Sequence, residues 1–315
     1  MRDHDVIARL EQRLGPVHAR RRLGMEEDHE ADCFGPRLNF FKVERWYSAH
    51  AVIRLGLRIA GLYGRARRNV GRVQVRRNTV VSPRLPHAFH GFTILQLSDL
   101  HADMSREAME RVAELLPDLR YDICAMTGDY RGKTFGPFAE SIAGLALVRA
   151  KLTGPVYGVL GNHDTIRMLP DLEDMGVRML MNETETLERG GEQLHLAGID
   201  DAHFFRVDNI GKVAAPRRDQ FSVLLSHTPE IYRQAAHAGF ALTLAGHTHG
   251  GQLCLPGGVP LMLDADLPRP LGAGPWRHRD MAGYTSVGCG SSLVAVRLNC
   301  LPEITLHRLE RPAGQ

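Results

Sequence analysis

Residues 92–101 read FTILQLSDLH, an apolar run that stops at the polar segment Asp99-Leu100-His101. An uninterrupted apolar run of this length predicts a strand that is buried on both faces of a sheet. Four later polar segments close apolar runs in the same way: GD at 128–129, GNHD at 161–164, the histidine at 227 and GHTH at 246–249. The repetition predicts a fold in which successive strands each end in polar side chains.

Strand-like and helix-like segments alternate along most of the chain. We expect strands at 92–97, 123–126, 156–160, 177–180, 184–188, 194–199, 221–225, 241–244 and within 283–309. We expect helices at 105–116, 138–150, 167–175 and 229–238. This alternation is typical of an α/β core. Ligands of open α/β sheets bind beyond the C-terminal ends of the strands, so the five polar segments are expected to meet at that edge.

The polar segments offer a mixed set of metal-ligating side chains. The candidates are Asp99, His101, Asp129, Asn162, His227, His247 and His249, and His163 is left over. Hard oxygen donors mixed with imidazoles suit Mn, Fe or Zn. Such a set is too large for one tetrahedral ion, but it suits two divalent ions that share a bridging carboxylate. Two neighbouring ions hold both the attacking and the leaving oxygen of an in-line displacement at phosphorus, so we expect a dinuclear metal-dependent phosphoesterase.

Length and composition are normal for a globular enzyme. The 315 residues, 43% hydrophobic and 24% charged, suffice for one large domain or two ordinary ones and do not predict disorder. The five cysteines are odd in number and include no Cys-x-x-Cys pair, which favours a reducing compartment. The sequence starts without a secretory pattern and has no run of about 18 apolar residues. We therefore expect a cytoplasmic chain without a spanning helix.

Positive charge is concentrated before the predicted sheet. Residues 37–84 contain twelve Lys or Arg and a single acid, Glu44. The segment 42–68 has a helical period, with an arginine stripe beside apolar and aromatic side chains, and 71–90 is expected to be extended. A basic amphipathic helix of this kind favours a peripheral anchor on an anionic membrane. The alternative is that its apolar face packs on the catalytic domain or on another subunit.

These patterns divide the chain into three parts. Residues 1–36 are expected to be a mobile or weakly helical tail, 37–84 a basic arm, and 85–315 the catalytic domain. Within the catalytic domain, the aromatic residues at 203–206 either receive part of the substrate or pack on the core. The Pro- and Gly-rich loop 256–282, which contains Trp276, is a candidate lid.

The strings SDLH, TGDY, GNHD, SHTP and AGHTHGGQ occur in this order. In this the chain resembles the calcineurin-like metallophosphoesterase superfamily over about residues 85–310. The resemblance implies a four-layer αββα sandwich of two mixed sheets. It also implies that Asp99, His101, Asp129 and His249 hold one ion, that Asp129, Asn162, His227 and His247 hold the other, and that a hydroxide bridging the ions attacks phosphorus.

The resemblance also implies a role for His163. In the superfamily this side chain points toward the substrate, where it stabilises charge on the phosphate and protonates the leaving oxygen. The next residue, Asp164, either orients the His163 ring or caps the following helix.

The GHTHGGQ string and the basic arm resemble a bacterial membrane-associated phosphodiesterase branch, some of whose members cleave UDP-2,3-diacylglucosamine. This implies a lipid or nucleotide-sugar-lipid substrate, cleaved at the cytoplasmic side of the inner membrane. One alternative is a soluble nucleotide or cyclic-nucleotide phosphodiesterase whose arm serves oligomerisation. A second is a non-catalytic scaffold of the same fold, although such a scaffold is expected to lack ligands. No nucleic-acid partner is expected, because the sequence has no basic groove interleaved with aromatic residues.

Overall fold

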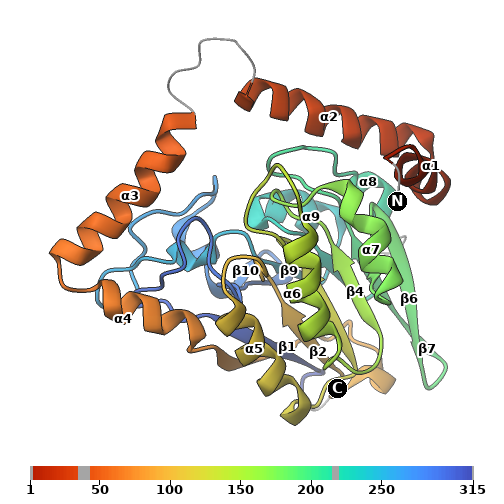
Figure 1. Ribbon diagram of the computed structural model, residues 1–315. Helices are drawn as coiled ribbons and strands as arrows, with labels where there is room; N and C mark the ends of the chain where they lie inside the picture. The colour runs from red at the N-terminus through yellow and green to blue at the C-terminus, as the bar shows by residue number, and fades with distance from the viewer. Residues whose placement is uncertain (1–2, 35–42, 215–219, 314–315) are drawn as a thin grey trace.

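Two six-stranded sheets face each other and carry helices on their outer faces (Figure 1). The structure is a computed structural model that describes residues 3–34, 43–214 and 220–313. Both sheets are mixed, and each contains a run of neighbouring parallel strands. The four-layer αββα arrangement expected from the resemblance is therefore confirmed.

The first sheet has the strand order β1-β12-β2-β3-β4-β5. Its strands are β1 Gln74–Val81, β12 Glu303–Glu310, β2 Thr93–Leu97, β3 Ile123–Thr127, β4 Val156–Val159 and β5 Arg178–Met179. Within it, β12 runs antiparallel to β2, and β2 to β5 run parallel to one another. Its outer face is covered by α5 Arg106–Leu115, α6 Ala139–Arg149 and α7 Leu169–Asp174. Ser105 caps α5 as its sequence position suggests, since its side chain accepts a hydrogen bond from the amide of Ala108.

The second sheet has the order β10-β11-β9-β8-β7-β6. Its strands are β10 Gly274–His278, β11 Met281–Thr285, β9 Leu242–Ala245, β8 Ser222–Leu225, β7 Glu192–Gly198 and β6 Glu183–Arg189. The helices α8 Ile210–Val213 and α9 Tyr232–Ala238 pack on its outer face. β10 lies in the segment 256–282 that was expected to be a loop. Trp276 of β10 is buried and donates to the Thr285 hydroxyl at 2.9 Å.

Three apolar clusters separate the layers. The central cluster lies between the sheets and contains, for example, Ile94 and Ile123 of the first sheet and Leu196 and Leu244 of the second. One outer cluster joins the first sheet to its helices, and the other joins the second sheet to α8 and α9. The strands that lead to the polar segments are therefore buried on both faces, which explains their uninterrupted apolar runs.

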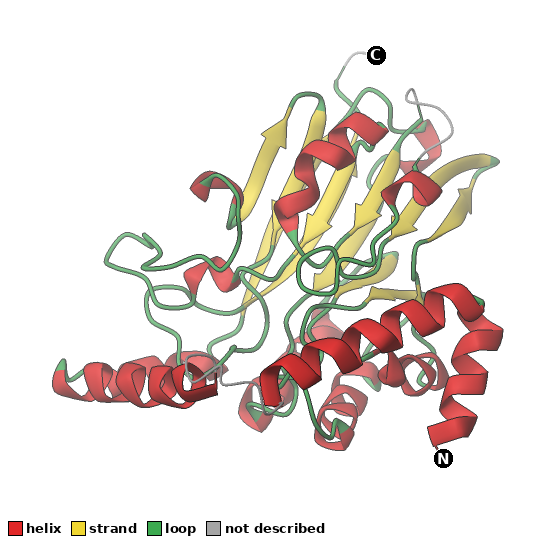
Figure 2. Cartoon of the chain, turned by 90° about the horizontal axis from the view of Figure 1, so that it is seen from above, coloured by secondary structure: helices red, strands yellow, loops and turns green. Residues whose placement is uncertain are grey.

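The structure differs from expectation in residues 3–34, part of the segment expected to be a mobile or weakly helical tail. These residues form two helices, α1 Asp3–Leu14 and α2 Pro16–Phe34, which lie against the catalytic domain (Figures 1 and 2). Leu10, Ala19 and Leu23 are buried in the same cluster as the first sheet. Packing of these side chains stabilises helices whose mixed-charge sequence gives a weak signal alone.

The basic arm also differs from the single helix expected over 42–68. It forms α3 Val43–Ile59 and α4 Tyr63–Arg68, separated by Gly61 at a φ of +69°. The end of the arm is β1, which pairs in parallel with β12, so the first sheet begins well before the expected boundary at residue 85. Residues 35–42, at the junction of tail and arm, lie outside the described residues.

Candidate metal centre

The five polar segments lie where five buried strands end. Asp99 and His101 follow β2, Asp129 follows β3, and Asn162 follows β4, all in the first sheet. In the second sheet, His227 follows β8, and His247 and His249 follow β9. The sheets thus contribute ligand candidates from both sides of the central core.

Glycines let these loops approach one another. A Cβ atom on Gly161 would lie 2.3 Å from Oδ1 of Asp129, and one on Gly246 would lie 2.2 Å from Oδ2 of Asp99. Both distances are far below van der Waals contact, so a side chain at either position would displace a ligand carboxylate. The glycines of the GNHD and GHTH strings are therefore required by the closeness of the loops.

Five ligand candidates have a left-handed backbone. The positive φ angles are 50° at Asp99, 39° at His101, 55° at Asp129, 71° at His247 and 51° at His249. Non-glycine residues rarely adopt this region, and each such residue costs on the order of 1–3 kcal/mol. The surrounding buried strands hold these residues in a strained conformation that directs their side chains to one site.

The first group of ligand candidates contains Asp99, His101, Asp129 and His249. One nitrogen or oxygen atom from each lies within 4.8 Å of the others, and all four residues are buried. The Nε2 atoms of His101 and His249 are 3.0 Å apart, and Nε2 of His249 is 3.4 Å from Oδ1 of Asp99. This spacing brings nitrogen and oxygen donors together around one point.

The second group shares Asp129 with the first and adds His227 and His247. Asp129 Oδ2 is 3.3 Å from Nε2 of His227 and 3.7 Å from Nε2 of His101, so one carboxylate faces both groups. Asn162 belongs to the second group as well, since its Oδ1 lies 2.9 Å from Nε2 of His227. The structure therefore brings all seven predicted ligands into two adjoining groups.

The hydrogen bonds of these histidines fit metal binding. The Nδ1 atoms of His101 and His227 lie 2.7 and 2.8 Å from the backbone carbonyl oxygens of Arg131 and Thr127. Donation from Nδ1 leaves the Nε2 lone pair free for an ion. His247 Nε2 is buried without a hydrogen-bond partner among the described residues, a costly state that a cation would relieve. The donor set fits two divalent ions.

Electrostatics keep the shared carboxylate ionised. Burial alone would raise the pKa of Asp129, but His227 and His163 outweigh it and hold that pKa well below its usual value. In return Asp129 raises the pKa of His227 to about 10, although burial opposes this. A protonated His227 thus balances the buried charge of Asp129 here, and a divalent cation bound at Nε2 would take the place of that proton.

His163 lies beside the ligand groups. Its side chain is almost fully buried, and its Nε2 is 4.0 Å from Oδ2 of Asp129. On the other side of the ring, Nδ1 lies 3.1 Å from the Thr134 hydroxyl. Burial lowers the pKa of His163 to about 4. This position leaves the ring next to the space that a ligand of the ions would occupy.

Asp164 has neither of the two roles considered for it from the sequence. Its carboxylate accepts hydrogen bonds of 2.8 Å from the backbone amides of Asp129, Tyr130 and Gly161. The 3₁₀ helix Ile166–Met168 is instead capped by the Thr165 side chain. Asp164 therefore joins the GD loop to the GNHD loop and fixes the backbone on which Asp129 is held.

The sequence pointed to the stretch 203–206 as a possible substrate contact, but it predicted neither the contact of His203 with His247 nor the part played by Glu230. The His203 ring stacks near His247, with 4.2 Å between ring centroids, and its Nδ1 is 2.6 Å from Oε2 of Glu230. Burial would lower the pKa of His203, but Glu230 raises it. The two residues line a cavity of about 720 Å³ together with Arg206, Arg233 and other side chains. Neither belongs to a polar segment that closes a strand, and no other sequence signal marks these contacts.

The aromatic residues that follow His203 pack rather than form a free surface. Phe205 is buried, and Phe204 contacts the His29 ring with 4.4 Å between centroids. Packing was one of the two interpretations of this stretch, and it is the arrangement that the structure shows.

Three similar proteins place the chain among phosphoesterases. It is 30% identical over 226 residues to an uncharacterized metallophosphoesterase, YkoQ of Bacillus subtilis, covering 69% of this chain and 83% of that protein. It is 28% identical to the phosphodiesterase YaeI of Escherichia coli, covering 69% and 82%. It is 27% identical to a transmembrane protein with metallophosphoesterase domain of Danio rerio, covering 70% and 54%.

Among solved structures, the calcineurin-like phosphoesterase YfkN of Bacillus subtilis aligns with a TM-score of 0.41 and 15% identity, covering 64% of this chain and 82% of that one. The sequence pattern of the family described as Calcineurin-like phosphoesterase matches residues 92–258, a span that includes both groups of ligand candidates. The chain therefore belongs to the calcineurin-like phosphoesterase family and is a metal-dependent phosphoric ester hydrolase.

Proposed function

We propose that the chain hydrolyses a phosphodiester or pyrophosphate bond with two divalent ions drawn from Mn, Fe and Zn. Asp99, His101, Asp129 and His249 would hold the first ion, and Asp129, Asn162, His227 and His247 the second. Ions at these positions supply water activation and neutralise charge on phosphate oxygens. The observation that carries the proposal is the position of Asp129 between the two groups.

His163 is the proposed catalytic residue. With Nδ1 beside the Thr134 hydroxyl, the ring presents Nε2 to the ligand groups. A bound phosphate brings negative charge to the neutral ring and favours its protonated form. His163 then donates a hydrogen bond to a phosphate oxygen and gives its proton to the leaving oxygen, a step worth typically 10²–10⁴-fold.

The cavity beside His203 is the proposed place for the group attached to the phosphate. It adjoins the second ligand group through the contact between His203 and His247. Its lining carries both signs of charge, from Arg206 and Arg233 on one hand and from Asp264 and Asp266 on the other. A polar leaving group, such as the nucleotide or sugar part of a nucleotide-sugar lipid, fits such a lining better than an acyl chain does.

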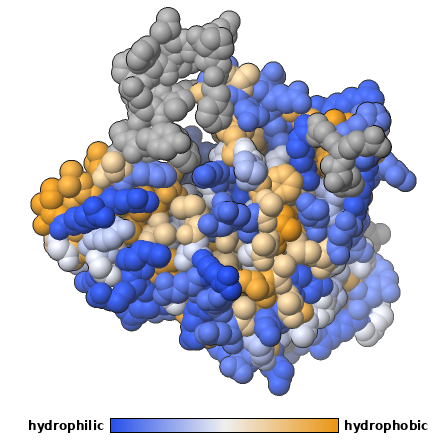
Figure 3. Space-filling view, in the orientation of Figure 1, coloured by the Kyte–Doolittle hydropathy of each residue, from blue (hydrophilic) through white to orange (hydrophobic). Residues whose placement is uncertain are grey.

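A peripheral membrane position is proposed from the two faces of α3. One face packs on the domain, where Leu57 is buried in a cluster with Val294, Val296 and Leu298. The other face leaves Val52, Leu55 and Ile59 exposed by 66, 59 and 79%. Figure 3 shows apolar side chains gathered on this side of the molecule. No described helix is long and apolar enough to cross a bilayer.

A second exposed apolar group lies in the loop after GHTHGGQ. It consists of Leu255, Val259, Leu261 and Met262. The loop starts at Leu253, which packs in the same cluster as Leu57 of α3.

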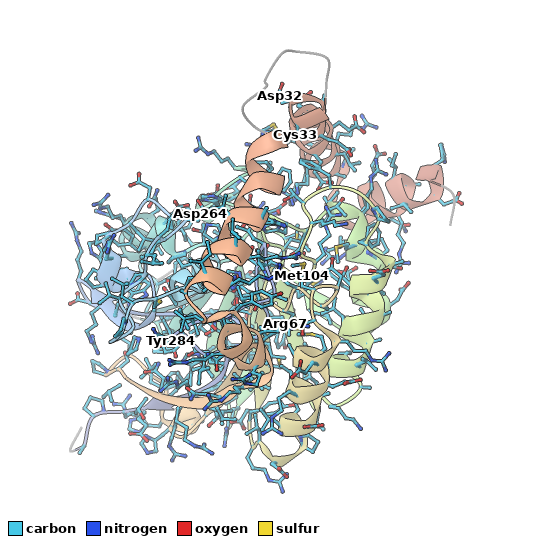
Figure 4. The ribbon with its side chains drawn as sticks, turned by 60° about the vertical axis from the view of Figure 1, so that its left-hand side comes forward. Asp32, Cys33, Arg67, Met104, Asp264 and Tyr284 are labelled. Carbon is cyan, nitrogen blue, oxygen red and sulfur yellow. The ribbon has the colours of Figure 1, made fainter. Side chains whose placement is uncertain are left out.

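In the view of Figure 4, α3 crosses the front of the molecule, with Met104 on one side and Asp264 on the other. Met104 follows the SDLH loop, and Asp264 lines the cavity. Anionic lipid attracts positive charge, and exposed arginines of α3 and α4 supply it: Arg54, Arg58, Arg65 and Arg67.

The chemistry is tested by metal analysis combined with turnover of three substrates. These are bis-p-nitrophenyl phosphate, p-nitrophenyl phosphate and UDP-diacylglucosamine, each with added Mn, Fe or Zn. We expect Asp129→Ala to lose bound metal and His163→Ala to keep two ions while losing at least about 10²-fold in kcat. Full metal occupancy in the Asp129 variant contradicts the shared ligand. Diester cleavage that does not depend on lipid indicates a soluble nucleotide phosphodiesterase instead.

The membrane position is tested by sedimentation with vesicles that contain anionic phosphatidylglycerol. We expect the wild-type chain to sediment with them and the triple variant V52S/L55S/I59S to remain in the supernatant. The matched control is Leu147→Ser, which removes an apolar side chain exposed by 40% on α6, away from α3. Equal sedimentation of the triple variant and the wild type disproves the anchor.

A further inference from the structure

Helix α2 contacts the two loops that border the second ligand group. One is the GNHD loop, with the residues that directly follow it, and the other is the loop 200–206, which carries His203. We propose that Arg22 and Glu26 of α2 are positioning residues that hold these loops in the arrangement the reaction needs. The inference rests on the proposed function, because it concerns the same site.

Glu26 binds the end of the GNHD loop directly. Its carboxylate accepts hydrogen bonds from the backbone amide of Ile166 at 2.7 Å and from the Thr165 hydroxyl at 2.5 Å. Ile166 is the first residue of a 3₁₀ helix, whose leading amides have no partner within the helix. Glu26 thus supplies, from a distant part of the sequence, the acceptor that fixes where this helix begins.

Arg22 extends the contact to both loops. Its fully buried guanidinium donates from Nη2 to the backbone carbonyl of Asp164 at 2.8 Å. It also lies 3.6 Å from the centroid of the Phe205 ring, and its Nε is 3.9 Å from Oδ1 of Asp200. Nε is 3.1 Å from Oε1 of Glu26, so the two α2 residues act as one unit.

The loops held in this way carry the side chains of the reaction. Asn162 and His163 directly precede the carbonyl that Arg22 binds, and the Asp164 carboxylate holds the amide of Asp129. In the other loop, His203 contacts His247. A displacement of about 1 Å at a reacting group costs up to 10²-fold in rate, so a tether on both loops affects turnover although α2 supplies no ligand.

Arg22 and Glu26 come from the N-terminal part of the chain. The family pattern begins at residue 92, whereas Arg22 and Glu26 lie far upstream of it. The two loops are therefore contacted by a segment outside the span that the family pattern matches. Without these contacts the GNHD loop would still follow β4, but the Ile166 amide at the start of the 3₁₀ helix would lose the Glu26 acceptor.

The test uses full-length Glu26→Ala with Glu26→Gln as the conservative variant and Arg13→Ala as the matched control. Arg13 also anchors the N-terminal helices, but it does so through Glu173 and Glu183, which belong to neither loop. We measure metal content, the separate values of kcat and KM on bis-p-nitrophenyl phosphate, and amide hydrogen exchange of the peptide covering 159–168.

In Glu26→Ala we expect two bound ions, a kcat lowered at least about tenfold, KM within about threefold of wild type, and exchange of the Ile166 amide at least about tenfold faster. Glu26→Gln keeps an oxygen acceptor and is expected to recover most of both effects. Arg13→Ala is expected to change neither kcat nor exchange in 159–168.

Two results overturn the proposal: unchanged exchange in 159–168 in the alanine variant, or equal losses of kcat in Glu26→Ala and Arg13→Ala, which would show a purely structural role. If the wild-type chain cleaves no diester with any metal, the proposed function fails. The exchange of the Ile166 amide then still decides whether α2 holds the loop.

Discussion

The two helical segments before β1 are both rich in arginine, yet the arginine side chains of the two segments have different surroundings. In α1 and α2, arginine side chains reach inward to acidic partners and backbone carbonyls, and Arg22 is fully buried. In α3, Arg54 and Arg58 are exposed next to the exposed apolar residues Val52 and Leu55. The helices α1 and α2 are therefore packed into the domain, whereas α3 exposes arginine and apolar side chains to solvent.

The difference follows from the balance of charges within each segment. Residues 1–36 contain acids as well as arginines, whereas 37–84 have only Glu44 against twelve Lys or Arg. An arginine is buried at acceptable cost only where a carboxylate or carbonyl meets it. The arm has almost no carboxylates of its own, and the arginines of α3 and α4 that the structure describes, Arg54, Arg58, Arg65, Arg67 and Arg68, remain exposed. An excess of basic residues therefore indicates that a segment keeps an exposed face, whereas a segment of mixed charge can pack on the domain.

The largest effect is expected at the buried arginine of the docked segment. Arg22→Ala should lower the free energy of unfolding by about 3 kcal/mol or more, because it removes the buried cation that lies 3.9 Å from the Asp200 carboxylate and donates to the Asp164 carbonyl. Burial alone would raise the pKa of Asp200, and Arg22 and His18 now hold it below its usual value. Urea unfolding measures the loss. Arg54→Ala in the exposed arm is the control, and an equal loss in both variants would remove the contrast between the segments.

A buried apolar side chain provides the second comparison. Leu10 on α1 is fully buried, whereas Leu55 on α3 is 59% exposed. Leu10→Ala is expected to cost about 2–3 kcal/mol, because it leaves a cavity in the packed cluster, and Leu55→Ala is expected to cost less than about 0.5 kcal/mol. The same urea series gives both values. A marginal loss at Leu10 would mean that α1 contributes little to the stability of the domain.

Binding of the membrane face should depend on its charge as well as on its exposed apolar side chains. The double variant R54A/R58A is expected to weaken binding to anionic vesicles by about 2 kcal/mol, or roughly 30-fold, at about 1 kcal/mol for each arginine near the surface. Raising the salt concentration should reduce wild-type binding in the same direction, because exposed charges are screened. Vesicle titrations at two salt concentrations measure both. If vesicle binding changes neither with salt concentration nor in the R54A/R58A variant, the exposed arginines do not bind lipid.

The sequence predicted the two sheets, and it placed the ligand candidates at the ends of their strands, because both features have a strong local signal. The run 92–97 is apolar on both faces, and the strand β2 was found at Thr93–Leu97. The polar strings that follow such strands meet in the structure because parallel strands end at the same edge.

The contacts made by α2 could not be predicted from the sequence. They join Arg22 and Glu26 to residues more than 130 positions away, and nothing local in a mixed-charge helix indicates its partner. The contacts of His203 could not be predicted for the same reason, since its neighbours Glu230 and His247 come from other loops. The segment 256–282 was taken for a loop because its Pro and Gly residues hide β10, which gains its stability by pairing with β11.

The smallest effect on stability is expected at an exposed ion pair of α1. Arg9 on α1 forms an ion pair with Asp174 of α7, and both side chains are largely open to water. Water and salt screen such a pair, and ordering two long side chains costs entropy. Arg9→Ala should therefore leave the urea midpoint within error of wild type, although Arg9 lies on the same helix as Leu10. A clear drop in the midpoint would mean that exposed charges hold α1 on the domain, and burial of arginine would then not account for how the N-terminal helices dock.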